Sequence, residues 1–511
     1  MVLTRSRIVA PALAASLALV AILTGAQGVD VAAATYRIEL FARSGLTLWD
    51  SQWYGGHWTF NYSVLFAPIG WLTGIPVLDI ICVALAAWAF DRLAVARFGR
   101  AGRAAAIAFA IGTVVQVAIG QEPYLLGETL GLVALLVARA GGRWRPLALL
   151  LGVACALASP LAGGFLALAV VSWMIGSWPT RRWDLVALAT AAIAPVVVLE
   201  ALFPGQGTMP FAWLNFAGML LALVPIGIVV AHRDRDRAIT AGVVLYAAAV
   251  VFAYAVPSAL GNNITRLGVC FGLALVVGLA WERRGGRLLL AAAAVPLALG
   301  QWVPAAQSLL GWGNVSMRVA YFEPLLGFLH GHDTPLGRVE VVPTALHWEA
   351  AYVAPYYPLA RGWERQLDTA NNTIFYTAGK LTPVSYRGWL FANGVRFVAL
   401  PDVPLDYAAA AESRIVRAGV PGLALVWRSP HWRVYSVSGA PGLVSGPARL
   451  VRSDGASVVL DAVRAGTLVV RERYVPAWRV AHGPATLGKA PGGWLRVQVT
   501  RPGRIELRIE L

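Results

Sequence analysis

Two acidic residues, Glu39 and Asp50, lie near the N-terminus in a segment rich in tryptophan and tyrosine. Trp53, Tyr54 and His57 follow Asp50 closely. Aromatic rings can stack on the faces of sugars, and a carboxylate beside them can remove a hydroxyl proton or hold a metal ion. The combination predicts a loop that handles carbohydrate. An aromatic belt at a membrane surface is the alternative, and it explains the aromatic residues but not the acids or the histidine.

Three further charged residues could contact a substrate. Glu122 stands at a tight connection between two apolar segments, where a carboxylate is costly unless it is solvated or partnered, and a solvated turn is the alternative. Arg266 begins a late apolar segment, where its planar guanidinium could hold a lipid phosphate or could simply extend toward the headgroups. Arg37, close to Glu39, is a second candidate for holding phosphate.

The composition predicts that lipid is part of the solvent around these residues. Hydrophobic residues make up 58% of the chain and charged residues only 13%, whereas soluble chains are about half apolar and a quarter charged. The apolar excess lies before residue 304 or so. The net charge is +16, but the basic residues fall between the apolar runs, which indicates membrane topology rather than nucleic-acid binding.

We expect about eleven transmembrane helices, because a spanning helix needs roughly 20 apolar residues. The predicted spans lie near 8–26, 75–94, 104–120, 125–140, 146–159, 160–177, 185–203, 211–231, 238–256, 267–281 and 288–304. A cleaved signal peptide is the alternative for residues 1–33, although the apolar stretch is long for one and no clear cleavage site closes it.

Every second connection between these spans is rich in arginine. The connections hold Arg5 and Arg7; Arg92, Arg97, Arg100 and Arg103; Arg139, Arg143 and Arg145; Arg181 and Arg182; Arg233, Arg235 and Arg237; and Arg283, Arg284 and Arg287. Short cytoplasmic loops collect positive charge. We therefore expect a multi-pass protein of the plasma membrane with a cytoplasmic N-terminus and with residues 305–511 outside.

The pattern predicts three regions. Residues 1–304 form the membrane bundle, in which residues 27–74 are the first and longest outer loop. Residues 305–425 read as an extracytoplasmic α/β segment, and residues 426–511 alternate apolar and polar residues between turn signals, as in an all-β, sandwich-like module. The cysteines, Cys82, Cys155 and Cys270, lie inside apolar runs without a paired motif, so we expect neither a disulfide nor a zinc site.

Three features resemble the GT-C class of membrane glycosyltransferases, which use polyprenyl-phosphate-linked sugars. The first outer loop carries acids and the run W-Y-G-G-H that ends at His57. Glu122 supplies an acid at the outer end of the third helix. The run from Arg473 to Trp478, R-Y-V-P-A-W, looks like a Y-x-P-x-W turn found in large bacterial members.

The resemblance implies that an Asp or Glu of the first outer loop is the catalytic base, often within paired acids or beside a divalent metal ion. Glu39 is then the first candidate base and Asp50 the second. No adjacent acid pair occurs in the loop, so metal use stays open. The candidate substrate-binding residues are Arg37, Trp53, Tyr54, His57, Glu122 and Arg266.

Two functions from different classes follow. The first is an inverting glycosyltransferase that moves a sugar from polyprenyl phosphate to an envelope glycan or lipid acceptor on the outer face, in contact with membrane lipids and with no nucleic-acid partner. The second is a non-catalytic scaffold or transporter for envelope polysaccharide or lipid. A transporter should show charged groups buried within its spans.

Overall fold

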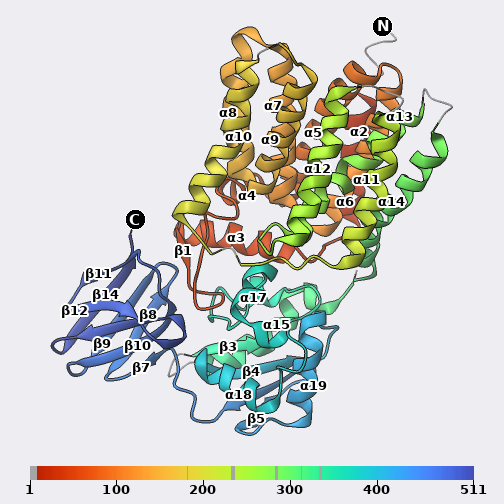
Figure 1. The fold of residues 1–511 in the computed structure, drawn as a ribbon. Helices are drawn as coiled ribbons and strands as arrows, with labels where there is room; N and C mark the ends of the chain where they lie inside the picture. The colour runs from red at the N-terminus through yellow and green to blue at the C-terminus, as the bar shows by residue number, and fades with distance from the viewer. Residues whose placement is uncertain are drawn as a thin grey trace. The chain divides into compact units, whose positions relative to one another are not determined.

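The structure is a computed structural model that describes residues 8–180, 182–205, 207–231, 236–281, 286–311, 313–332 and 337–510 (Figure 1). It divides into two compact units: unit 1 is Met1–Ala34 with Phe60–Trp312, and unit 2 is Thr35–Thr59 with Gly313–Leu511. Most of the predicted first outer loop therefore belongs to the same unit as the C-terminal region. Of the predicted topology arginines, Arg5, Arg7, Arg181, Arg233, Arg235, Arg283 and Arg284 lie outside the described residues.

Unit 1 is helical, and each of the eleven predicted spans overlaps one of its helices. These are α2 (Val9–Leu23), α5 (Ile75–Phe98), α6 (Ala101–Ile119), α7 (Glu122–Ala140), α8 (Arg145–Ala158), α9 (Pro160–Gly176), α10 (Trp183–Leu202), α11 (Trp213–Val229), α12 (Arg237–Ala255), α13 (Thr265–Trp281) and α14 (Arg287–Leu310). A short helix, α4 (Phe66–Thr73), precedes α5.

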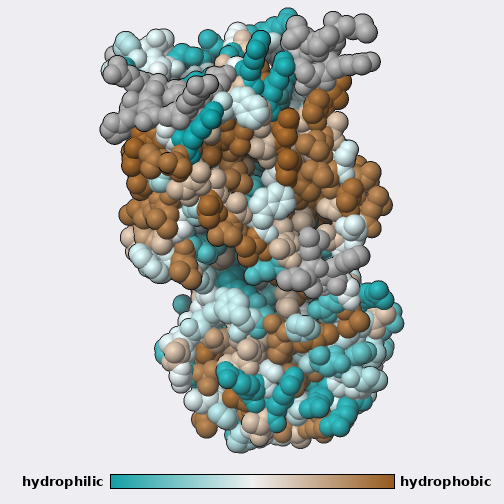
Figure 2. Space-filling model, turned by 90° about the vertical axis from the view of Figure 1, so that its right-hand side faces the viewer, coloured by the Kyte–Doolittle hydropathy of each residue, from teal (hydrophilic) through white to brown (hydrophobic). Residues whose placement is uncertain are grey.

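Six helical stretches within the described residues are long and apolar enough to cross a membrane, and α4 with α5 would add a seventh as a pair bent by 109°. The other predicted spans are shorter helices, so the count of eleven crossings is not confirmed. Apolar side chains lie exposed on the helix surfaces, among them Val197, Leu221, Val244 and Val295. Figure 2 shows hydrophobic surface over much of the helical unit. Such a surface suits lipid rather than water.

Local signals explain where several of these helices begin and end. Proline occupies the first turn of α5, α7, α8 and α9, where its missing N–H costs nothing. Ser159 caps α9 by accepting from the Ala162 N–H, and Asp236 caps α12 in the same way. Cys82, Cys155 and Cys270 are buried free thiols.

Unit 2 contains a mixed four-stranded sheet in the order β3-β4-β6-β5, formed by β3 (Arg338–Val341), β4 (Val395–Pro401), β5 (Leu423–Arg428) and β6 (Trp432–Val437). Strands β3 and β4 are parallel, and the other pairs are antiparallel. The helices of this part are α15 (Val319–His330), α16 (Glu349–Tyr352), α17 (Arg365–Asn371), α18 (Pro383–Ala392) and α19 (Ala410–Ala418). Its apolar core includes Tyr386, Leu390, Val398 and Leu400.

Two antiparallel four-stranded sheets follow, in the orders β12-β13-β10-β7 and β11-β14-β9-β8. The strands are β7 (Val444–Ser445), β8 (Ala448–Asp454), β9 (Ser457–Ala462), β10 (Gly466–Arg473), β11 (Trp478–His482), β12 (Ala485–Lys489), β13 (Trp494–Val499) and β14 (Gly503–Ile509). Alternate residues of the central strands are buried, as in a sandwich. Strands β5 and β6 pair with β4 instead, so the two-sheet module begins at Val444 and not at residue 426.

The N-terminal part of unit 2 consists of α3 (Val31–Ser44) from Thr35 onward and a small hairpin of β1 (Trp49–Asp50) and β2 (His57–Trp58). In this hairpin Asp50 pairs with His57 and Trp49 pairs with Trp58. Tyr54, Gly55 and Gly56 adopt positive φ in the connection, a backbone shape that glycine favours. The hairpin brings the predicted acid and the predicted histidine side by side.

Candidate functional site

One cavity of the helical unit has a volume of about 680 Å³ and is lined by residues of unit 1 alone. Its polar lining consists of Asp30, Gln116, Gln121, Asn215, Asn262, Asn263, Thr265, Arg266, Gln301 and Gln307. Its apolar lining includes Val115, Ile119, Leu214, Met219, Val269, Leu297, Leu299 and Val303. We call this the unit 1 cavity.

Asp30 and Arg266 form an ion pair at this cavity, with 3.9 Å between Asp30 Oδ2 and Arg266 Nη2. Both side chains keep some exposure, 16% for Asp30 and 22% for Arg266, so both can meet a ligand. The Arg266 guanidinium also lies over the ring of Tyr124, 5.5 Å from its centroid. An arginine fixed in this way presents its donors to an anionic group in a defined direction.

Backbone packing against the end of α6 positions Asp30. The Asp30 N–H donates to the Ile119 carbonyl at 3.3 Å. A Cβ atom at Gly28 would overlap the main chain of Ile119, and one at Gly120 would overlap that of Val31. Gly120 also has φ near +85°, which side chains other than glycine rarely adopt. Two glycines therefore allow the close approach that sets the carboxylate at the cavity.

Short hydrogen bonds hold the amide side chains of the lining. Asn215 Nδ2 donates to Asn262 Oδ1 at 2.9 Å, and the Thr265 hydroxyl donates to the Asn262 carbonyl at 2.8 Å. Gly112 of α6 leaves room for Gln301 of α14, because a Cβ there would overlap the Gln301 amide. A cation, several amides and a long apolar wall suit an amphiphile with an anionic, hydroxyl-rich head.

Acidic residues are buried within the helices that neighbour the cavity. Glu122 is 2% exposed in the first turn of α7, and its carboxyl repels that of Asp79, which is buried in α5. Glu128 accepts from Gln116 Nε2 at 3.0 Å, and Gln116 itself lines the cavity. Of the two predicted residues in unit 1, Arg266 lines the cavity, while Glu122 stands beside the lining residue Gln121.

Asp50 is fully buried in unit 2, and both of its carboxylate oxygens accept hydrogen bonds. The Tyr36 hydroxyl donates to Oδ2 at 2.8 Å, and the Gln52 N–H donates to Oδ1 at 3.0 Å. Burial raises the pKa of Asp50 above its ordinary value, although the hydrogen bonds from Gln52 and Tyr36 oppose that shift. Within this structure the side chain links the hairpin to α3 and is not exposed to solvent.

Three of the predicted binding residues lie against Glu364. Arg37 donates to its carboxylate, His57 Nε2 lies 3.9 Å from the same oxygen, and the Tyr54 hydroxyl donates to the Glu364 carbonyl at 2.9 Å. Burial lowers the pKa of His57 to about 3, and the charge of Arg37 acts in the same direction. His57 is therefore neutral at physiological pH.

The rings of Tyr36, Trp53 and His57 pack on one another and are buried. The rings of Tyr36 and Trp53 stack with centroids 4.4 Å apart, and the rings of Trp53 and His57 are nearly parallel at 5.5 Å. Trp53 also fills the space beside Gly362, where a Cβ would overlap its ring atoms. These rings form part of the interior of unit 2, so they present no open stacking surface here.

Glu39 lies apart from this cluster on α3. Its side chain is 40% exposed and faces Arg43 one helical turn on, with 3.8 Å between Oε1 and Nε. It is therefore the accessible acid of the two predicted bases. A pair this exposed contributes little to stability.

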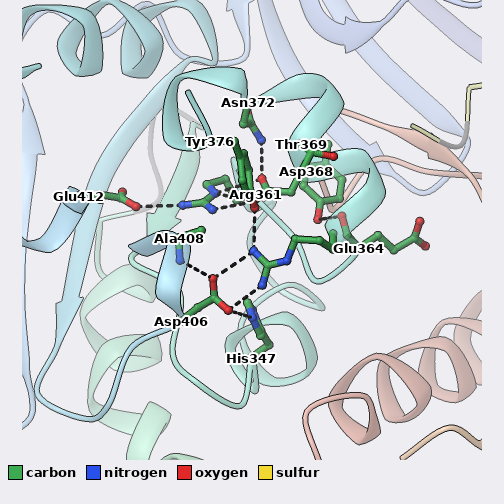
Figure 3. A network of polar contacts seen from close by, with 12 residues as sticks. His347, Arg361, Glu364, Asp368, Thr369, Asn372, Tyr376, Asp406, Ala408 and Glu412 are labelled. Atoms are coloured by element: carbon green, nitrogen blue, oxygen red, sulfur yellow. Dashed lines mark hydrogen bonds and ion pairs between the residues drawn. The ribbon is translucent and has the colours of Figure 1, made fainter. Parts of the chain in front are cut away.

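A buried charge network fixes the segment that carries Glu364 (Figure 3). Arg361 binds Asp368 and Glu412, at 2.6 Å and 3.0 Å. Arg365 binds Asp406 at 2.6 Å, and the imidazole of His347 lies 3.3 Å from the same carboxylate. The network joins α17, α19 and the turn at His347.

His347 is held between two acids within this network, Glu349 on one ring nitrogen and Asp406 on the other, each at 3.3 Å. Burial opposes its charge, but the two carboxylates prevail and raise the pKa of His347 to about 9. Burial likewise opposes the charge of Asp406, yet His347 and Arg365 hold the pKa of Asp406 below its ordinary value. His347, Arg365 and Asp406 therefore remain ionised together at neutral pH.

The sequence reasoning missed Asp30 and the amides of the unit 1 cavity. Asp30 is the first acid after the first apolar segment, and that position was the available signal. Within the described residues, no group of three or more His, Cys, Asp or Glu side chains is placed to hold a metal ion. No protein-family model and no curated protein matches this chain.

Proposed function

We propose that this protein is a membrane glycosyltransferase of the GT-C type, which transfers a sugar from a polyprenyl-phosphate donor to an envelope glycan or lipid outside the membrane. The observation that supports this best is the Asp30–Arg266 pair in a cavity whose remaining lining is part amide and part apolar. In this proposal Arg266 binds the donor phosphate, the amides bind sugar hydroxyls, and the apolar wall receives the first isoprene units.

Asp30 is our candidate for the catalytic base. It belongs to the first outer loop, as the GT-C resemblance requires, and it lines the cavity, whereas Asp50 is enclosed in unit 2. The Asp30 carboxylate takes the proton of an acceptor hydroxyl while that oxygen bonds to the anomeric carbon. The bond from the anomeric carbon to the phosphate oxygen breaks with inversion, and Arg266 stabilises the negative charge on the leaving polyprenyl phosphate. Glu39 remains the second candidate. Among the residues that the structure describes, no cluster of His, Cys, Asp or Glu side chains fits a metal ion, and no step is assigned to one.

The number of membrane crossings and their orientation are part of the same proposal. We propose that all eleven apolar helices cross the membrane, that the N-terminus is cytoplasmic, and that residues 305–511 are outside. The alternation of arginine-rich and arginine-poor connections supports this arrangement.

A non-catalytic transporter or scaffold for envelope polysaccharide or lipid is the second candidate. It is favoured by the acids buried within helices of unit 1, Asp79 in α5 and Glu128 in α7. Ionisable groups inside membrane helices are often part of a transport or proton pathway. In a transporter these acids would matter more than Asp30.

The test compares Asp30→Asn, Glu39→Gln and Glu128→Gln in proteoliposomes. A set of polyprenyl-phosphate sugars is supplied together with an envelope glycan and lipid extract as the acceptor, and release of polyprenyl phosphate is measured. We expect Asp30→Asn to slow release by about 10²- to 10⁴-fold and the other two to change it little. Unchanged release in Asp30→Asn would remove Asp30 from the mechanism. Release that is absent from the wild type, together with lipid or glycan flux that Glu128→Gln abolishes, would favour the transporter.

A further inference from the structure

The outer face of the sheet β11-β14-β9-β8 carries rows of exposed arginines (the sheet lies within the blue part of Figure 1). In one row Arg449 of β8 and Arg504 of β14 lie on either side of Asp461 of β9 and are in register with it. In another row Arg479 of β11 lies directly opposite Arg508 of β14. Like charges directly opposite each other destabilise a sheet. The stability of the fold therefore does not explain the Arg479–Arg508 pair, whereas Asp461 offsets the repulsion between Arg449 and Arg504.

Two β-bulges add to the same face. The register shifts at Val451 in β8 and at Ala481 in β11, so Arg452 and His482 come to lie on the outer side of the sheet. Side chains alternate between the two sides of a strand. Without the extra residue, each of these polar side chains would point into the apolar interior of the module.

Two turns extend the face beyond the row at Asp461. Arg464 lies in the turn after β9 and Arg501 in the turn before β14, and both are exposed. The two turns lie at the same end of the sheet, because Gly503 pairs with Ala462. Arg464 and Arg501 thus lie beyond the same end of the row formed by Arg449, Asp461 and Arg504.

The whole surface, which we call the basic face, carries a net positive charge. Its arginines are Arg449, Arg452, Arg464, Arg479, Arg501, Arg504 and Arg508, and its acids among the described side chains are Asp461, Glu506 and Glu510. Seven cations against three anions give a net charge of +4. Arg508 bonds Glu506 at 2.8 Å, whereas Arg464 and Arg501 extend the positive charge beyond the row at Asp461. A field of this sign attracts polyanions.

We propose that the basic face binds an anionic polysaccharide, a polymer with carboxylate or phosphate groups along its chain. Arginine forks match both groups. A lipid surface fits less well, because among the described residues of the module only Val451 and Val463 are large apolar side chains that lie exposed. Surfaces that enter a bilayer combine basic residues with a broad apolar face. Binding at the basic face is independent of the unit 1 cavity.

The test measures binding of the full chain in nanodiscs of neutral lipid to polygalacturonate, with neutral dextran as the comparison polymer. The double variant R449Q/R504Q removes two charges of the basic face, and R496Q/K489Q removes two exposed charges from the opposite sheet as the matched control. We expect the first to weaken polygalacturonate binding by roughly tenfold or more and the control to leave it unchanged. Raising the salt concentration should weaken wild-type binding.

A third variant, Asp461→Asn, should strengthen binding, since it removes the acid between two arginines. A merely structural role for this residue would not increase affinity. Equal loss in R449Q/R504Q and the control, or equal binding of dextran, would overturn the proposal. Binding to phosphatidylglycerol vesicles without binding to polygalacturonate would overturn it in favour of a lipid surface.

Discussion

Asp30 Oδ2 lies 3.9 Å from Arg266 Nη2, although the two residues are far apart in the sequence and come from opposite ends of the helical unit's chain. The distance is longer than a tight hydrogen bond, and both groups keep partial exposure. In the proposed reaction the donor phosphate binds Arg266 and the acceptor hydroxyl approaches Asp30.

Arg266→Lys tests whether the planar fork or only the charge matters. We expect binding of a long-chain polyprenyl phosphate to weaken by about tenfold in Arg266→Lys and by roughly 100-fold in Arg266→Gln, because a lysine cannot bond phosphate in two places at once. Native mass spectrometry of the purified protein measures the bound fraction. Equal binding by the wild type and both variants would show that the phosphate sits elsewhere.

Gly28→Ala should reduce lipid binding and turnover without altering a charged group. The new Cβ would overlap the main chain of Ile119 and move Asp30 away from Arg266. We expect a loss of about 1–3 kcal/mol in stability, as for other overpacked sites. Gly164→Ala in α9 is the matched control, because a Cβ there meets open space. If both variants behave like the wild type, the backbone contact is not what positions Asp30.

Tyr36→Phe should destabilise unit 2, since it removes the hydroxyl that donates to the buried Asp50. The expected cost is about 1–3 kcal/mol, the penalty for leaving a buried acceptor unsatisfied. Asp50→Asn should cost less, because the amide oxygen still accepts from Tyr36 and burial already disfavours the charged form. Thermal unfolding of the full chain measures both. A larger loss in Asp50→Asn would indicate that the charge itself is required.

His347 should make the stability of unit 2 depend on pH. Its pKa is raised from 6.5 to about 9, so its contribution is complete below pH 6.5 and is lost as the pH rises through 9. The contribution is of the order of 3 kcal/mol. Thermal unfolding of the wild type and of His347→Gln should therefore differ most at pH 6 and converge above pH 9.

Glu472 also titrates near pH 7, because burial raises its pKa to about 7, so the difference between the two proteins is the informative quantity. A pH-independent difference would contradict an ionised His347.

Periodicity and composition were enough to place the helices of unit 1, because each helix is a local feature of an apolar run. The strands of the C-terminal module followed from alternation for the same reason. The partners of the charged residues could not be read in this way. Arg37 binds Glu364, which lies 327 positions away, and neither local sequence predicts that pairing.

The aromatic run from Trp53 to His57 shows the same limit. Its composition suits a surface that stacks sugars, yet in the structure Trp53 is enclosed by Tyr36 and by Gly362 from distant parts of unit 2. Burial depends on which distant segments return to the loop, and residue type alone does not determine it. The sequence-based prediction missed Asp30 because a single acid among small residues produces no periodic pattern.

The main-chain contact of residues 28–31 with residues 119–120 gives a pattern by which distant relatives can be recognised. Side chains around the cavity can vary while the ligand class stays the same, but the two backbones can touch only where both positions lack a Cβ. The pattern Gly-x-Asp after α2, combined with a glycine directly after α6, is therefore more selective for such relatives than hydropathy alone.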